Sequence, residues 1–152
     1  MALSCAEASR LITPVFRFSF KEPTMNSDKS AETSALAIMQ QHLDALNALE
    51  EDGLAATLHF PHYRLVDVNL DFWPSKDRYL GDFRVRAGGN WARTAWHSIT
   101  VQRASNNKVH LAVRINRFDA ADNLIADFDS LWVITHKHGK WAAQFRSSFA
   151  AA

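Results

Sequence analysis

Cysteine is almost absent from the sequence, since Cys5 is the only one among 152 residues. A single cysteine excludes an internal disulfide and a cysteine-rich zinc module, and it is typical of proteins from a reducing compartment. Long apolar runs are missing as well: no stretch of about 18 apolar residues occurs, and a transmembrane helix needs about that length. We therefore expect a cytoplasmic protein.

A predominance of one charge is also lacking. The sequence has 17 basic and 16 acidic residues, which gives a formal net charge of +1. This balance provides no general electrostatic attraction to nucleic acid or to an anionic membrane. Phosphate-binding glycine loops, nucleophile elbows and HExxH-type metal motifs are not found either. We expect no nucleic-acid or membrane partner, no cofactor and no metal.

What the sequence does have is the composition of one globular domain. With 47% hydrophobic and 22% charged residues, a chain of this length can bury a sizeable core. We expect the domain at residues 30–150. Residues 1–29 are interpreted as an extension that is disordered or that precedes the natural start, for which Met25 is a candidate. The apolar segment Leu11–Phe20 is interrupted by a proline and an arginine, so it lacks the continuous core of a secretory signal.

The first half of the domain has the pattern of helices. Apolar residues recur at three- and four-residue spacing, which predicts an amphipathic helix that starts near Ser30 and stops near Gly53. Its predicted buried stripe is Leu36, Met39, Leu43, Leu46 and Leu49. A second short helix is expected over 54–58, and a third begins after Pro74 with Ser75 as its cap. Between them, Tyr63–Trp73 is rich in strand formers and predicts two very short strands or one irregular strand.

The C-terminal part has the pattern of a sheet. Four runs of alternating character are separated by short turn-forming segments, and they cover Trp91–Ala104, Lys108–Asp119, Leu124–Lys137 and Lys140–Phe149. Consecutive strands joined by short turns form an antiparallel meander. Because helices come first and a sheet follows, the predicted fold is α+β rather than alternating α/β.

Neither face of the predicted sheet is fully polar. In Leu124–Lys137, the apolar Leu131 and Val133 share a face with Asp127 and Asp129. A sheet that helices cover on one side should present polar side chains to water on the other. The mixed face predicts a homodimer through the outer sheet face, and the alternative is a set of scattered surface apolar residues, which are common.

Two strings and the order of the elements resemble a known superfamily. Leu58-His59-Phe60-Pro61-His62 ends the second predicted helix, and Arg146-Ser147-Ser148-Phe149-Ala150 closes the last predicted strand. Together with a long first helix, a short third helix and a four-stranded meander, these strings resemble NTF2-like domains. The likeness is strongest to SnoaL-like and ketosteroid-isomerase-like domains of uncharacterised function, and it covers most of the chain.

The resemblance implies a cystatin-like cone, in which N-terminal helices pack on a curved antiparallel sheet and leave a small-molecule pocket. Members include isomerases, polyketide cyclases, dehydratases and domains that only bind partners, so this fold implies no single reaction. Ketosteroid isomerases use a carboxylate base together with a tyrosine and a carboxylic acid that stabilise an enolate. These three roles do not fall on matching motifs in this sequence.

Three residues are candidates for acid–base catalysis. His97 lies on a largely apolar strand face, Asp129 lies among apolar residues of the third long strand, and His62 closes the HFPH string. A histidine titrates near neutral pH, and apolar surroundings disfavour the ionised form of a carboxylate; both properties suit proton transfer. Each residue also has a structural interpretation. The histidines would be hydrogen-bonded core or corner residues, and Asp129 would form an ion pair with Arg114 or Arg146.

A second group contains the candidate ligand contacts. Aromatic rings suit the walls of a pocket for a flat ligand, although large aromatic side chains more often belong to a core or an interface. An arginine can hold a carboxylate or enolate oxygen. The candidates are Tyr63, Trp73, Trp96, Trp132 and Arg146. Two functions follow: cofactor-free proton transfer on a small apolar carbonyl compound, or a non-catalytic homodimeric domain that binds a ligand or a protein.

Overall fold

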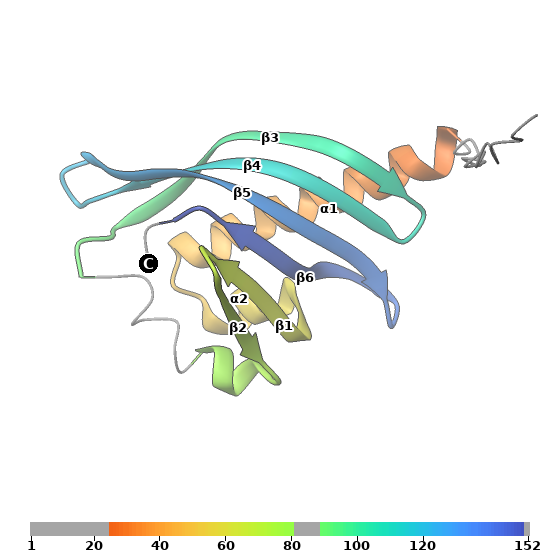
Figure 1. The fold of residues 1–152 in the computed structure, drawn as a ribbon, viewed down its shortest axis with the longest axis horizontal. Helices are drawn as coiled ribbons and strands as arrows, with labels where there is room; N and C mark the ends of the chain where they lie inside the picture. Colours follow the sequence, from red (N-terminus) through yellow and green to blue (C-terminus); the bar gives the residue numbers. More distant parts are fainter. Residues whose placement is uncertain (1–24, 81–88, 151–152) are drawn as a thin grey trace, which may run out of the picture.

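The computed structural model describes residues 25–80 and 89–150 of the chain, so the interpretation of residues 1–24 lies outside the described residues. Figure 1 shows a long helix, α1 (Met25–Asn47), lying behind a curved sheet, with the short helix α2 (Glu51–Ala56) near its end. A further helical turn covers 76–80. The expected α+β architecture is confirmed. No helix within the described ranges combines the length and the apolar character that crossing a membrane requires.

Six strands form one sheet in the order β2-β1-β6-β5-β4-β3. Their bounds are β1 Leu58–Val66, β2 Asn69–Trp73, β3 Arg93–Ser105, β4 Lys108–Phe118, β5 Leu124–Lys137 and β6 Lys140–Ser148. The last four strands form the expected antiparallel meander. β1 and β2 form an antiparallel hairpin, and β1 joins the meander by pairing with β6 in the parallel direction. This parallel pair places β1, the first strand of the chain, beside β6, the last.

The predicted end of the first helix is wrong. α1 ends at Asn47, and Gly53 lies inside α2 instead of stopping α1. The helix closes through Leu49, which has a φ of 57° while its N–H bonds to the Leu46 carbonyl, and the Glu50 N–H bonds to the Ala45 carbonyl. This is the Schellman arrangement, in which glycine is the usual residue at the left-handed position. Because a leucine occupies that position here, the sequence gives no stop signal there.

Other expected boundaries in the N-terminal half also differ. α1 begins at Met25, so Ser30 lies inside the helix rather than capping it. The string Leu58–His62 opens β1 instead of ending a helix, because the chain leaves α2 at Thr57 and pairs at once with β6 through Leu58 and Ala143. Tyr63–Trp73 forms parts of two strands, as one of the two interpretations expected.

The hydrophobic core lies between α1 and the concave side of the sheet. The helix buries a face of mostly small residues, namely Ala31, Ala35, Met39, His42 and Ala45, whereas Leu36 and Leu49 are 40% and 54% exposed. The predicted stripe was therefore displaced around the helix. Alanines let the helix approach the sheet closely, and the sheet supplies the large side chains, among them Leu111, Trp132 and Ile134.

Side chains alternate between the two faces of each strand, which defines an inner face toward α1 and an outer face away from it. On β5, the inner face carries Phe128, Ser130, Trp132 and Ile134, which are all buried, and the outer face carries mostly exposed or half-buried residues. The strand register extends this division across the whole sheet.

Candidate functional site

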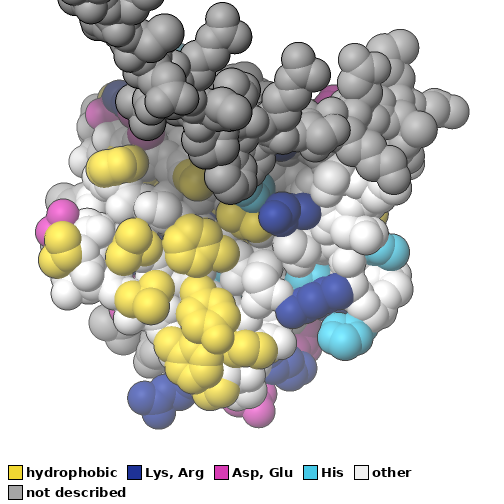
Figure 2. Space-filling model, turned by 45° about the vertical axis from the view of Figure 1, so that its right-hand side comes forward, with side chains coloured by type: hydrophobic (Ala, Val, Ile, Leu, Met, Phe, Trp, Pro, Cys, Tyr) yellow, Lys and Arg dark blue, Asp and Glu magenta, His cyan; other side chains and the backbone are white. Residues whose placement is uncertain are grey.

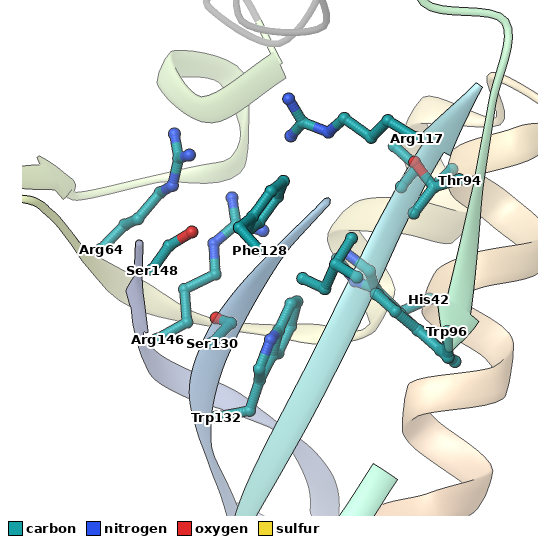
Figure 3. Close-up of a pocket in the computed structure, with 12 residues that line it drawn as sticks. His42, Arg64, Thr94, Trp96, Arg117, Phe128, Ser130, Trp132, Arg146 and Ser148 are labelled. Carbon is teal, nitrogen blue, oxygen red and sulfur yellow. The ribbon is translucent and has the colours of Figure 1, made fainter. Parts of the chain in front are cut away.

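A cavity lies on the inner face of the sheet beside α1 (Figure 3). The enclosed volume is about 40 Å³, and the empty space of the hollow is about 360 Å³ when the part open to solvent is included. Small-molecule sites commonly enclose about 300–1,000 Å³, so a ligand here would fill the small enclosed part and extend into the open part. We call it the inner pocket. Its lining residues are His42, Leu46, Arg64, Thr94, Trp96, Ile115, Arg117, Phe128, Ser130, Trp132, Arg146 and Ser148.

Aromatic rings form part of its wall. Trp132 is 1% exposed, and its ring meets that of Trp96 edge-on with 5.9 Å between centroids. Trp96 is held in place from α1, because its Nε1–H donates a hydrogen bond of 3.1 Å to the Met39 carbonyl. Phe128, one inner position before Ser130 on β5, adds a third ring. These side chains provide a rigid apolar surface.

Three arginines reach the same pocket from β1, β4 and β6 (Figure 3). Arg64 and Arg146 are register partners across the parallel strand pair. Arg146 lies over the ring of Trp132 at 5.1 Å, and Arg117 lies over the ring of Phe128 at 5.1 Å. Burial, followed by the positive charge of Arg146, lowers the pKa of Arg117. Among the lining residues that the structure describes there is no Asp or Glu, so their formal charge is positive.

His42 is the histidine among the described residues that line the pocket. It is 2% exposed, and its Nδ1 lies 2.7 Å from the Thr57 hydroxyl. The Thr57 hydroxyl donates its own proton to the Leu54 carbonyl, so it accepts a hydrogen bond from His42 Nδ1–H. The Nε2 atom therefore carries the lone pair. Burial, the charge of Arg146 and then that of His62 lower the pKa of His42 well below its usual value, which keeps the ring neutral.

The edge of the pocket is clamped between α1 and β3. The Asn47 side chain donates to the Thr94 carbonyl at 2.9 Å and accepts from the Thr94 N–H at 2.8 Å. The Thr94 hydroxyl in turn accepts a hydrogen bond of 2.9 Å from Trp91 Nε1–H. Asn47 is the last residue of α1, so this clamp fixes the helix end against the strand that contributes Thr94 and Trp96 to the pocket.

Three of the five predicted ligand contacts line the inner pocket, namely Trp96, Trp132 and Arg146. The other two lie elsewhere. Tyr63 is on the outer face, where its ring packs against Phe72 with 5.2 Å between centroids. Trp73 is 4% exposed and packs against the rings of His62 and Tyr79, outside the pocket lining.

None of the three predicted catalytic residues lines the inner pocket. His97 is exposed and sits where the pairing of β3 with β4 shifts register. Asp129 lies on the outer face, where Arg114 Nη1 donates a 3.0 Å hydrogen bond to it and Arg114 Nη2 bonds to Asp127. His62 is fully buried, and its Nδ1 lies 3.2 Å from the Ala143 carbonyl. Asp129 thus forms the ion pair with Arg114 that was one of its two interpretations in the sequence.

His42, Arg64 and Arg117 were missed as pocket residues, although two of them carry a local signal. His42 follows Met39 by three positions on the buried face of α1, and Arg117 continues the inner alternation of Val113 and Ile115 on β4. Arg64 has no such signal, because its place depends on the pairing of β1 with β6. Among the residues that the structure describes, no group of three or more His, Cys, Asp or Glu side chains is arranged to hold a metal ion.

The outer face carries two rows of mostly apolar side chains. The register aligns Phe72, Tyr63, Phe145 and Val133 in one row and Leu70, Leu65, Ser147 and Leu131 in the next. Leu70, Phe72 and Leu131 are 61%, 52% and 37% exposed. Figure 2, turned from the view of Figure 1, shows hydrophobic side chains gathered on this side of the molecule. We call this set the outer apolar rows.

Comparison with known proteins supports the fold. A protein of unknown function with a cystatin-like fold from Nostoc punctiforme is 11% identical with a TM-score of 0.66, over 79% of this chain and 90% of that one. An NTF2-like protein of unknown function from Pseudomonas putida is also 11% identical with a TM-score of 0.66, over 81% of this chain and 88% of that one. A Novosphingobium aromaticivorans protein provisionally named a scytalone dehydratase is 14% identical with a TM-score of 0.63, over 85% of this chain and 89% of that one.

No family model and no curated protein sequence matches the chain. The similarity to solved structures is thus one of fold. The chain has the NTF2-like, cystatin-like α+β fold, as the resemblance in the sequence implied.

Proposed function

We propose that the inner pocket binds a small, largely apolar compound that carries a ring and a carbonyl or similar oxygen. The observation that carries this proposal is the make-up of the pocket wall. Trp96, Phe128 and Trp132 supply flat apolar surface, and a few polar groups, including those of Ser130 and Arg146, converge on the same space. Small-molecule sites combine apolar walls with a small number of placed polar groups in this way.

Titration of ¹⁵N-labelled protein with a panel of cyclic ketones and aromatic carbonyl compounds tests the proposal. The indole N–H signals of Trp96 and Trp132, which line the pocket, should shift on binding. Trp141, which packs against His136 outside the lining, serves as the internal reference and should stay unchanged. A panel that moves neither pocket signal would refute the proposal.

A pair of variants separates the pocket from the rest of the sheet. Ile115 is 6% exposed and lines the cavity, so Ile115→Phe should fill it and weaken binding about tenfold or more. Leu131→Phe places the same ring on the outer face and should leave the affinity unchanged. Equal affinities for both variants would place the ligand outside the inner pocket.

We propose proton transfer as a second function, because His42 presents a neutral imidazole in this pocket. Nε2 would accept a proton from a carbon beside the carbonyl group, and the electrons of the broken C–H bond would move to the carbonyl oxygen to form an enolate. A guanidinium such as that of Arg146 can donate a hydrogen bond to this oxygen. Return of the proton to another carbon would complete an isomerisation. One of the similar structures carries the name of a dehydratase, which agrees with acid–base chemistry in this fold.

Exchange of substrate C–H protons in D₂O measures this second function directly. His42→Gln should abolish exchange while ligands still shift the Trp132 indole signal, because glutamine keeps an N–H for Thr57 but provides no comparable base. The predicted candidates His97 and Asp129 lie outside the pocket, so His97→Gln and Asp129→Asn should leave exchange unchanged. Exchange that persists in His42→Gln would exclude His42 as the base.

We also propose that a second copy of this chain covers the outer apolar rows. Apolar side chains run across four neighbouring strands, and the ion-paired group of Arg114, Asp127 and Asp129 lies beside them. An apolar centre with a polar, charge-balanced rim is the usual make-up of an interface between identical subunits.

A further inference from the structure

Three arginines, Arg64, Arg117 and Arg146, line the inner pocket together. Arg64 and Arg146 are adjacent on paired strands, and like charges placed opposite each other destabilise a sheet. Arg64 approaches the carboxylate of the partly exposed Asp71 at 4.0 Å. Among the described residues, neither Arg117 nor Arg146 has a carboxylate oxygen within 4.0 Å.

Arg114 provides the contrast within the same sheet. It lies on the outer face of β4, three residues before Arg117, and it bonds to both Asp127 and Asp129. The outer arginine is thus neutralised by two carboxylates, although it is more accessible to water than a buried group and needs them less. Arg117 and Arg146 on the inner face are half-buried and lack such neutralisation by the carboxylates of the described residues.

Buried hydrogen-bond donors in the pocket are also left without acceptors. The Nε of Arg146 and the Nε1 of Trp132 are buried, and neither has a hydrogen-bond partner among the described residues. Both residues line the pocket, and the Arg146 guanidinium lies over the Trp132 ring. A buried donor without an acceptor is costly, particularly when it belongs to a charged group. An acceptor that enters the pocket would remove this cost.

We propose that the ligand of the inner pocket is an organic anion, a carboxylate on an apolar ring, whose carboxylate is held by Arg146 with Arg117 and Arg64 beside it. This inference rests on the proposed small-molecule function and specifies the class of ligand. A carboxylate fits the planar fork of a guanidinium in a bidentate manner. The ring contacts Trp132 and Phe128, which already carry the two guanidinium groups on their faces.

The test compares benzoate with benzamide, which has the same ring and nearly the same shape but no charge. In the wild-type protein benzoate should bind at least tenfold more tightly than benzamide, as read from the Trp132 indole signal. Arg146→Met should remove this preference by weakening benzoate alone. The matched control Arg114→Met, on the outer face, should change neither affinity.

Each alternative outcome is decisive. Equal binding of benzoate and benzamide in the wild type, with no effect of Arg146→Met, would overturn the anion proposal and leave the small-molecule function standing. Binding of neither probe would remove both. Should Arg146→Met fail to fold, Arg117→Met replaces it, because Arg117 is not a register partner of Arg64; an undiminished preference for benzoate in that variant would overturn the guanidinium cluster as the site.

Discussion

Lowering the pH from 7.5 to 5.5 should destabilise the fold through His42. Burial, Arg146 and His62 lower the pKa of this histidine well below 6.5 in the folded protein, whereas the unfolded chain restores the ordinary value. Between these two values the unfolded state binds one more proton than the folded state. The stability is therefore complete above about pH 6.5 and is lost as the pH falls toward the folded-state value.

The magnitude follows from proton linkage. For a folded-state pKa below this range and an unfolded-state pKa of about 6.5, one histidine lowers the free energy of unfolding by up to about 1.4 kcal/mol between pH 7.5 and pH 5.5. Burial also lowers the pKa of His59, and this adds a loss of the same sign. Because carboxylates titrate mainly below this range, histidines dominate the pH dependence in it.

Urea unfolding, followed by tryptophan fluorescence at pH 7.5, 6.5 and 5.5, measures the effect. His42→Gln should lower stability at every pH, since it removes the edge contact of the imidazole ring with Trp132, but it should flatten the pH dependence by up to about 1.4 kcal/mol. His97→Gln, at an exposed site, is the matched control, and its free energy of unfolding should depend on pH as that of the wild type does. Parallel curves for wild type and His42→Gln would show that His42 binds its proton equally in both states, and the reasoning from burial would fail.

Two further predictions concern the clamp and the outer face. Asn47→Ala removes the two hydrogen bonds between Asn47 and the Thr94 backbone, so it should lower the free energy of unfolding in urea by about 1.5–3 kcal/mol. Asn106→Ala, in an exposed turn, should lower it by less than about 0.5 kcal/mol. Equal losses in the two variants would show that the clamp does not stabilise the fold. Phe72→Lys should convert a dimer into a monomer in sedimentation velocity, and Leu36→Lys on exposed α1 surface should not. A wild-type monomer at micromolar concentration would refute the proposed homodimer.

The strands of the meander were predictable because their signal is local. Alternation of apolar and polar residues over ten or so positions is sufficient to identify β4 and β5, and both were found close to their true bounds. The helix end was not predictable in the same way. Leu49 adopts a left-handed conformation in which glycine is expected, so the residue that ends α1 carries no signal.

The site was only partly predictable, for a related reason. Trp132 and Arg146 could be predicted as ligand contacts because the residue type alone, a large aromatic ring or an arginine on a strand, suggests that role. The face on which Asp129 lies could not be assigned from a strand that is apolar on both sides, since its outer apolar residues resemble a second core face. Asp129 therefore kept two interpretations in the sequence, a catalytic carboxylate and a partner of Arg114 or Arg146.

The position of Arg64 in the pocket could not be predicted from the sequence. Arg64 stands beside Arg146 only because β1 pairs in parallel with β6, a contact between distant parts of the chain that no local pattern specifies. The same pairing creates the electrostatic conflict of the inner pocket, since it aligns two positive side chains on one face. Arg114, on the outer face, is instead paired with two carboxylates. On our proposal that the inner pocket binds an organic anion, the inward arginines would face its carboxylate, and the positive charge of the pocket is the property to use in the search for that ligand.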